Sequence, residues 1–143
     1  MDKDIVLKIE NTINYNFKNV SLLQTAFTHS SFAYIHGVES NERLEFLGDS
    51  VLNYSTTRYL FDNFNFTEGE FSKIRAYLVS SEYLSEYIKS TGLINYLQCN
   101  NFDPHNSTNV MGDLFESIVG AMLLDADLET CKKFIYNSLN YSK

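Results

Sequence analysis

The sequence lacks several residue types whose abundance would point to particular classes of protein. Its 143 residues include no tryptophan, one proline, six glycines and two cysteines. So few prolines and glycines argue against a collagen-like or loop-rich chain. Cys99 and Cys131 have neither a CxxC partner nor a histidine cluster, so neither a zinc site nor a disulfide framework is expected. We expect both to be reduced packing residues in a cytoplasmic chain.

Long apolar runs are absent as well. No run reaches the roughly 18 residues of a membrane span, and the first four residues hold two acids with no apolar stretch behind them. We therefore expect no signal peptide and no membrane partner. Hydrophobic residues still make up 44% of the sequence and aromatic residues 15%, which is enough for one buried core. A single domain over residues 1–143 is the expected organisation.

Positive charge is also scarce, because 11 lysines and arginines stand against 18 acids and give a net charge of −7. Proteins bind phosphates through lysine and arginine, so this sum alone would exclude a nucleic-acid partner. The exclusion holds only if the acids are spread over the surface. Acids that converge on bound cations form a site of very different effective charge, so their positions decide the question.

Apolar residues recur at helical spacing along most of the chain, and no segment alternates as a strand would. Residues 4–15 begin this pattern, and a polar stretch at residues 100–109 is the only clear loop. The sequence therefore predicts an all-α fold of about seven helices. Helix starts are expected at Ser21, Ser40 or Asn41, and Thr67, and helix ends at Gly37 and Gly92.

Two pairs of acids lie within mainly apolar helical stretches. Glu45 and Asp49 are four residues apart, and Asp113 and Glu116 are three apart, so each pair shares one helix face. Acids in such surroundings are costly unless they pair with cations, and Arg43 is the main nearby base. Four carboxylates from two crossing helices would suit Mg²⁺ or Mn²⁺, the ions that assist phosphoryl transfer.

The simpler interpretation is that each acid pair lies on a solvated helix face, which is common. Three glycines favour the metal site instead. Gly48 and Gly112 each stand directly before an acid, and Gly120 follows in the second stretch. Glycine inside a helix costs about 1 kcal/mol relative to alanine, and it usually allows another helix or a ligand to come close.

The stretch NERLEFLGDSVL at residues 41–52 closely resembles the signature of the ribonuclease III family. The resemblance continues in LLQTAFTHSSF at residues 22–32, in Glu68-Gly69 followed by RAYLVS at 75–80, and in GDLFESIVGAMLLD at 112–125. These segments occur in the family's order and cover nearly the whole chain, which makes a chance match negligible.

This resemblance implies an all-α endonuclease domain that works as a homodimer. Each subunit of the family holds an acidic Mg²⁺ cluster at the rim of a shared valley for double-stranded RNA, and each site cuts one strand. The products carry 5′-phosphates, 3′-hydroxyls and two-nucleotide 3′ overhangs. Mn²⁺ is expected to substitute for Mg²⁺.

Residue by residue, the resemblance assigns functional roles to six acids and one aromatic residue. Glu116 matches the position whose loss most selectively stops cleavage, and Phe46 matches an aromatic that plugs into the partner subunit. Glu42 and Glu68 match two auxiliary acids near the family's site. His29 lies at a position that looks structural. The catalytic metal ligands implied by the resemblance are Glu45, Asp49, Asp113 and Glu116.

One departure from the family is that no double-stranded-RNA-binding domain follows residue 143 in this sequence. An excised domain and a reduced natural variant both fit this observation. A non-catalytic dimerisation or RNA-scaffolding module on the same fold is the alternative function, and a phosphohydrolase acting on small phosphate compounds is a more remote one. Retention of all four acids favours the endonuclease.

Overall fold

The computed structural model describes residues 1–141, and the regular secondary structure among these residues is helical. The predicted all-α class is confirmed, with one α-helix more than the seven or so expected. Extended backbone pairs at one isolated bridge within residues 1–141, between Thr28 and Gln98. Two 3₁₀ turns, η1 (Leu93–Tyr96) and η2 (Pro104–Asn106), connect α6 to α7. The α-helices are α1 (Lys3–Ile13), α2 (Val20–Ala26), α3 (Ser30–His36), α4 (Glu42–Asn63), α5 (Glu68–Leu78), α6 (Ser81–Thr91), α7 (Thr108–Asp125) and α8 (Leu128–Ser138).

Strong local signals mark several helix boundaries, and the predictions made from them are confirmed. Thr67 and Glu70 form a reciprocal capping box at the start of α5. Gly37 and Gly92 end α3 and α6 with φ of 65° and 74°. Glycine adopts such left-handed backbone without steric cost, which explains why these two helices end there.

Asparagines take special roles at the boundaries of the first two helices, and one of these boundaries differs from the prediction. Asn14 ends α1 with a left-handed φ of 57°. Asn19, rather than Ser21, caps α2, since its side-chain oxygen accepts a hydrogen bond from the Ser21 amide at 3.1 Å. Asparagine tolerates both conformations better than most residues.

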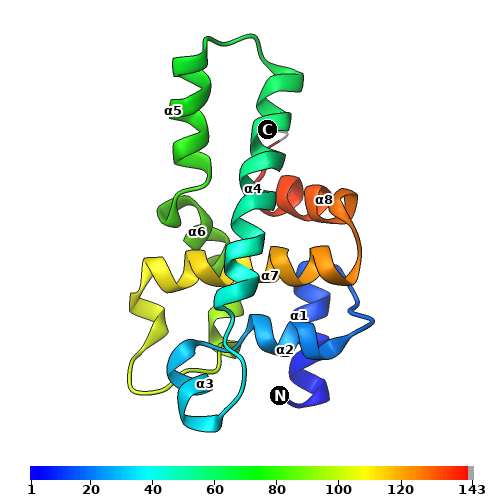
Figure 1. Ribbon diagram of the computed structural model, residues 1–143, viewed down its shortest axis with the longest axis vertical. Coiled ribbons are helices and arrows are strands. Elements are labelled where there is room, and N and C mark those ends of the chain that lie inside the picture. The colour runs from blue at the N-terminus through cyan, green and yellow to red at the C-terminus, as the bar shows by residue number, and fades with distance from the viewer. Residues whose placement is uncertain (142–143) are drawn as a thin grey trace.

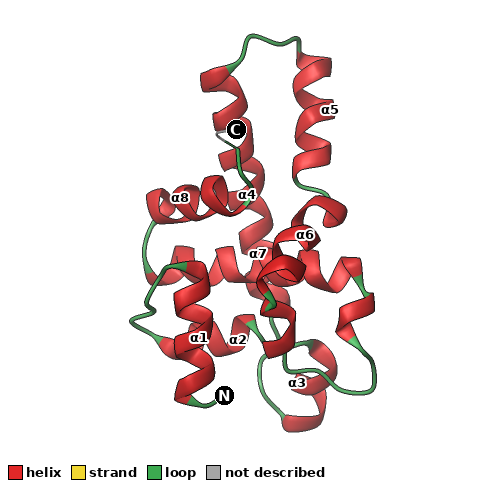
Figure 2. Ribbon diagram, turned by 180° about the vertical axis from the view of Figure 1, so that it is seen from behind, coloured by secondary structure: helices red, strands yellow, loops and turns green. Residues whose placement is uncertain are grey.

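Helix α7 is the centre of the fold. Ten of its 18 residues are buried, which is typical of a helix enclosed on most sides. Figures 1 and 2 show α4 crossing α7, with α2, α6 and α8 around it. Beyond this body, the second half of α4 projects with α5 beside it, and every residue of α5 is at least partly exposed in the described chain. Among residues 1–141, no helix combines the length and apolar character that crossing a bilayer requires.

The middle of α4 is tied to the end of the described chain by tyrosine hydroxyls. The Tyr141 hydroxyl lies 2.6 Å from that of Thr56, and the Tyr141 carbonyl accepts a hydrogen bond from Tyr59. Tyr136 on α8 donates to the Ser55 carbonyl at 3.1 Å. These bonds lie about two to three turns beyond the predicted metal ligands of α4, so they anchor a separate part of the helix.

Candidate metal centre

The two helices that carry the acid pairs touch backbone to backbone where they cross. A Cβ atom added to Gly48 would lie 1.7 Å from the Glu116 carbonyl oxygen, and one added to Gly120 would lie 2.1 Å from the Leu44 carbonyl oxygen. Only glycine fits at either position. The prediction that these glycines permit a close approach is therefore confirmed.

Gly112 has a different neighbour. A Cβ atom there would lie 3.0 Å from the Ser81 hydroxyl oxygen and 3.1 Å from the Ser81 Cα, at the start of α6. This glycine therefore lets α6, rather than α4, approach α7.

Three of the four predicted metal ligands converge at the crossing of α4 and α7. One carboxylate oxygen each from Glu45, Asp113 and Glu116 lies within 4.8 Å of the others, and all three residues are half-buried. Asp49 is exposed and lies beside this group, close enough for a side-chain hydrogen bond and its charge to raise the pKa of Glu116. The crossing thus brings all four acids together, with three in the tighter arrangement.

The ionisation of these acids reflects their crowding. Burial, followed by a hydrogen bond to Asp113 and its charge, raises the pKa of Glu45 to about 7. Burial and then the hydrogen bond to Asp49 raise the pKa of Glu116 to about 9. Burial also raises the pKa of Asp113, although a hydrogen bond from Glu45 and the nearby His29 oppose it. Without a cation, the cluster therefore holds protons near neutral pH that a bound cation would displace.

The donor set fits a divalent cation of the hard type. Carboxylate oxygens are the ligands that Mg²⁺ and Mn²⁺ prefer. Arg43, the main base near the acids in sequence, pairs with Glu39 at 3.6 Å and is almost fully exposed. The ion pairs within residues 1–141 involve acids outside the cluster. The four clustered acids therefore remain available to bind a cation.

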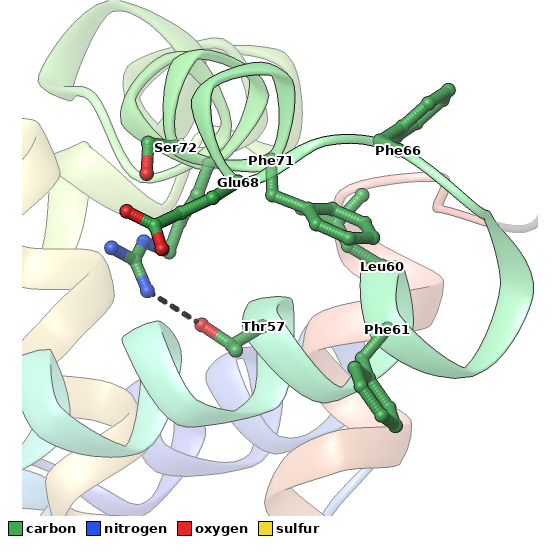
Figure 3. A pocket seen from close by; sticks show the side chains of 8 residues that line it. Thr57, Leu60, Phe61, Phe66, Glu68, Phe71 and Ser72 are labelled. Carbon is green, nitrogen blue, oxygen red and sulfur yellow. Dashed lines mark hydrogen bonds between the residues drawn. The ribbon is translucent and has the colours of Figure 1, made fainter.

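The two predicted auxiliary acids lie in different places. Glu42 is exposed in the first turn of α4, and its charge contributes to the raised pKa of Glu45. Glu68 begins α5 and lines a cavity of about 530 Å³ between α4 and α5, outside the converging group. There Arg75 donates a hydrogen bond to Thr57 at 3.0 Å (dashed in Figure 3). Within one chain, Glu68 is therefore separate from the acid cluster.

Phe46 points away from its own chain. Its side chain is 83% exposed, although it follows Glu45 directly. Phe46 lines one side of a cavity of about 780 Å³, together with the apolar Leu22, Leu47 and exposed Leu124 and the charged Glu39, Glu42 and Arg43. A large aromatic side chain thus protrudes at the edge of a hollow that has apolar and charged walls.

Two further polar residues act on the local structure. His29 caps α3 by accepting a hydrogen bond from the Ser31 amide at 3.1 Å, and its ring packs on Phe102, which agrees with a structural role. Asn53 donates its side-chain amide to the Asp49 carboxylate at 3.2 Å and to the Asp49 carbonyl at 2.9 Å. Asn53 is absent from the residues predicted from the sequence, although its i+4 spacing from Asp49 was a usable signal.

A sequence model of the ribonuclease-III-like family matches residues 19–141. The chain belongs to the ribonuclease III family. Among its relatives, ribonuclease 3 of Streptococcus gordonii is 40% identical over 128 residues, which cover 84% of this chain and 55% of the relative. Ribonuclease 3 of Clostridium perfringens is 39% identical over 140 residues, which cover 93% of this chain and 59% of the relative. The chain thus spans rather more than half the length of these curated relatives.

Solved ribonuclease III structures share the fold. The nuclease domain of ribonuclease III from Campylobacter jejuni superposes with a TM-score of 0.86 and 33% identity, covering 94% of this chain and 96% of that one. That structure is described as showing structural flexibility in a region involved in dimer formation. A second structure of the same Campylobacter domain gives the same TM-score at 32% identity. The ribonuclease III nuclease-domain fold expected from the sequence is confirmed.

Proposed function

We propose that this chain is an endoribonuclease domain that cleaves double-stranded RNA with the help of divalent metal ions, Mg²⁺ foremost and Mn²⁺ as a substitute. The observation that carries the proposal is the convergence of Glu45, Asp113 and Glu116, with Asp49 beside them, where two helices of a ribonuclease III fold cross. A non-catalytic scaffolding module would have no need of four acids crowded at such electrostatic expense.

The four acids would hold the ion through their carboxylate oxygens. A bound divalent ion supplies Lewis acidity and lowers the pKa of a water molecule near the scissile phosphate. Hydrolysis would join the oxygen of a water molecule to phosphorus and break the bond to the 3′ oxygen, and the proton that the water loses would balance the proton that the 3′ oxygen gains. The products are then a 5′-phosphate and a 3′-hydroxyl. Half-burial of the acids limits solvent screening and strengthens their hold on the cation.

We also propose that the active form is a homodimer in which Phe46 enters the hollow beside the partner's own Phe46. An interface between two copies related by a two-fold axis uses the same patch on both, so a protrusion and a hollow must lie on one face. Phe46 and the cavity lined by Leu22, Leu47 and Leu124 meet that requirement. Two acidic centres in one dimer would cut one strand each and leave two-nucleotide 3′ overhangs.

The remaining assignments are proposals of the same kind. Residues 1–143 would form one endonuclease domain that acts on RNA in the cytoplasm. Glu42 would be an auxiliary acid that modulates Glu45, on whose pKa its charge already acts. An auxiliary role for Glu68 would require the second subunit, because within one chain Glu68 lines the cavity between α4 and α5.

Cleavage of a perfect RNA duplex, labelled on each strand in turn, tests the proposal. With Mg²⁺ or Mn²⁺ we expect cuts offset by two nucleotides between the strands, and products that a 5′-phosphate-dependent exonuclease degrades. EDTA should stop the reaction, and a DNA duplex of the same sequence should stay intact. Binding of the RNA duplex without cleavage in either metal would support the scaffolding alternative instead.

A further inference from the structure

The carbonyl oxygen of Ala26, at the end of α2, is a buried meeting point of three helices. The Ser117 hydroxyl of α7 donates to it at 2.8 Å, and the side-chain amide of Asn41, which precedes α4, donates to it at 3.2 Å. Ala26 and Ser117 are fully buried, and Asn41 is 5% exposed. One acceptor thus receives a donor from each of the two segments that carry the acids.

Asn41 is linked directly to Glu45, the first of the predicted metal ligands on α4. Its backbone amide donates to the Thr28 carbonyl at 2.8 Å, and its own carbonyl accepts from the Glu45 amide at 2.8 Å. Together with the bond to Ala26, three hydrogen bonds fix Asn41 in place. The start of α4 is therefore tied to the end of α2 through the same residue that holds the Glu45 backbone.

Ser117 has the corresponding place on α7. It follows Glu116 directly, and its hydroxyl is shared between the Ala26 carbonyl and the Leu114 carbonyl at 2.9 Å. A buried hydroxyl must be hydrogen-bonded to be tolerated. Alanine would serve the helix better at a buried interior position, so the stability of α7 alone does not explain a serine here.

The side chain of Asn41 does not make the helix cap that its position before α4 favours. Asparagine before a helix normally caps it, its side-chain oxygen accepting from an amide of the first turn. At the start of α4 that cap is not made, and the side chain donates to Ala26 instead. Of the two caps expected from the sequence, Ser40 accepts a hydrogen bond from the Glu42 amide at 3.3 Å, whereas Asn41 makes a bond between helices in place of a cap.

A second fixed point is needed to define how α4 lies on α7. The contacts of Gly48 with Glu116 and of Gly120 with Leu44 set how closely the helices approach at their crossing, and an anchor away from the crossing further restricts how α4 can turn on α7. The Ala26 carbonyl lies on a third helix and holds both segments near their acids. We propose that Asn41 and Ser117 are positioning residues that set the spacing of the Glu45 and Glu116 carboxylates, and through it the affinity for the divalent cation.

This inference rests on the proposed metal centre, and its primary measurement is cation binding rather than cleavage. Titration calorimetry with Mn²⁺ alone, without RNA, compares the unaltered chain with Asn41→Ala and Ser117→Ala. Residues that orient metal ligands typically change affinity by about 10- to 100-fold when lost. We expect each substitution to weaken Mn²⁺ binding by about tenfold, and the double substitution by less than the product of the two, because both side chains share one acceptor.

Thr56→Val is the matched control. It also removes a buried hydrogen bond from α4, but the lost partner is Tyr141 and the site lies away from the acids. Its Mn²⁺ affinity should equal that of the unaltered chain even if its melting temperature falls as far as that of Ser117→Ala. Equal weakening by Thr56→Val, or unchanged affinity in folded Asn41→Ala and Ser117→Ala, would overturn the proposal. If Asn41→Ala does not fold, Ser117→Ala decides.

Hydrogen exchange in the metal-free chain separates this inference from the proposed function. Loss of the Asn41 anchor should speed exchange of the amides of residues 42–46, including that of Glu45, while residues 55–60 exchange as before. If the unaltered chain binds Mn²⁺ no better than Glu116→Gln does, the metal centre itself is refuted. Unchanged exchange at residues 42–46 in both variants would instead refute the positioning roles.

Discussion

Replacing Gly120 with alanine should test how closely the two acid-bearing helices approach. The added Cβ would lie 2.1 Å from the Leu44 carbonyl oxygen, about 1.3 Å short of the 3.4 Å at which ordinary contact begins. Both groups belong to the backbone, so neither can rotate away and the helices must part. Overpacking a tight interior typically costs 1–3 kcal/mol, and we expect a loss of about 3 kcal/mol in the free energy of unfolding.

For a domain of this size, that loss corresponds to a fall of roughly 10 °C in melting temperature. Gly69→Ala is the matched control, because Gly69 lies in helix α5 and has open space around it. There alanine should stabilise the chain by up to about 1 kcal/mol. Thermal and urea unfolding of both variants measure the difference, and Mn²⁺ titration should show weaker binding for Gly120→Ala. Equal melting temperatures for the two variants would refute the close approach.

Three further predictions concern the charge, the dimer and RNA binding. Because the folded-state pKa of Glu116 is raised from 4.5 to about 9, the metal-free folded chain binds more protons than the unfolded chain between these values. The free energy of unfolding should therefore fall as pH rises through that window, by about 1–2 kcal/mol after allowance for partial exposure. Glu116→Gln should lessen this fall. Urea unfolding that gives the same free energy from pH 5 to 9 would contradict the prediction. Phe46→Asp should give folded monomers, as measured by light scattering. A dimer that persists, or a chain that misfolds, would show that Phe46 does not lie in the dimer interface. Duplex RNA should bind weakly, more strongly when Ca²⁺ is added and not at all in EDTA. The affinity should depend only slightly on salt concentration, because the net charge is −7. Fluorescence anisotropy that shows tight binding without metal would contradict this prediction.

Much of the architecture follows from signals that act over a few residues. The capping box at Thr67 and the left-handed glycines at Gly37 and Gly92 fix helix ends by local backbone chemistry. The acid pairs were found because residues three or four apart share a helix face. Glycines inside the apolar stretches predicted a close helix contact, and the contact of Gly48 with α7 confirms it.

Long-range contacts explain what the sequence could not predict. Ser117 lies 91 residues from Ala26, so their hydrogen bond depends on how the helices pack. The side chain of Asn41 leaves its expected cap for the same reason. Arg43 lies near the acids in sequence, yet it pairs with Glu39 one turn before it. The distance of Glu68 from the cluster also depends on the path of α4 and α5 rather than on any local pattern.

Duplex-RNA cleavage by Glu116→Gln, measured beside Glu86→Gln, tests the central claim most directly. Glu86 is an exposed acid on α6, so Glu86→Gln makes the same chemical substitution without touching the cluster. Both variants should fold and sediment as the unaltered chain does. Glu86→Gln should show normal Mg²⁺-dependent cleavage, and Glu116→Gln should lose cleavage. Near-normal cleavage by Glu116→Gln would contradict the assignment of the metal centre to the crossing of α4 and α7.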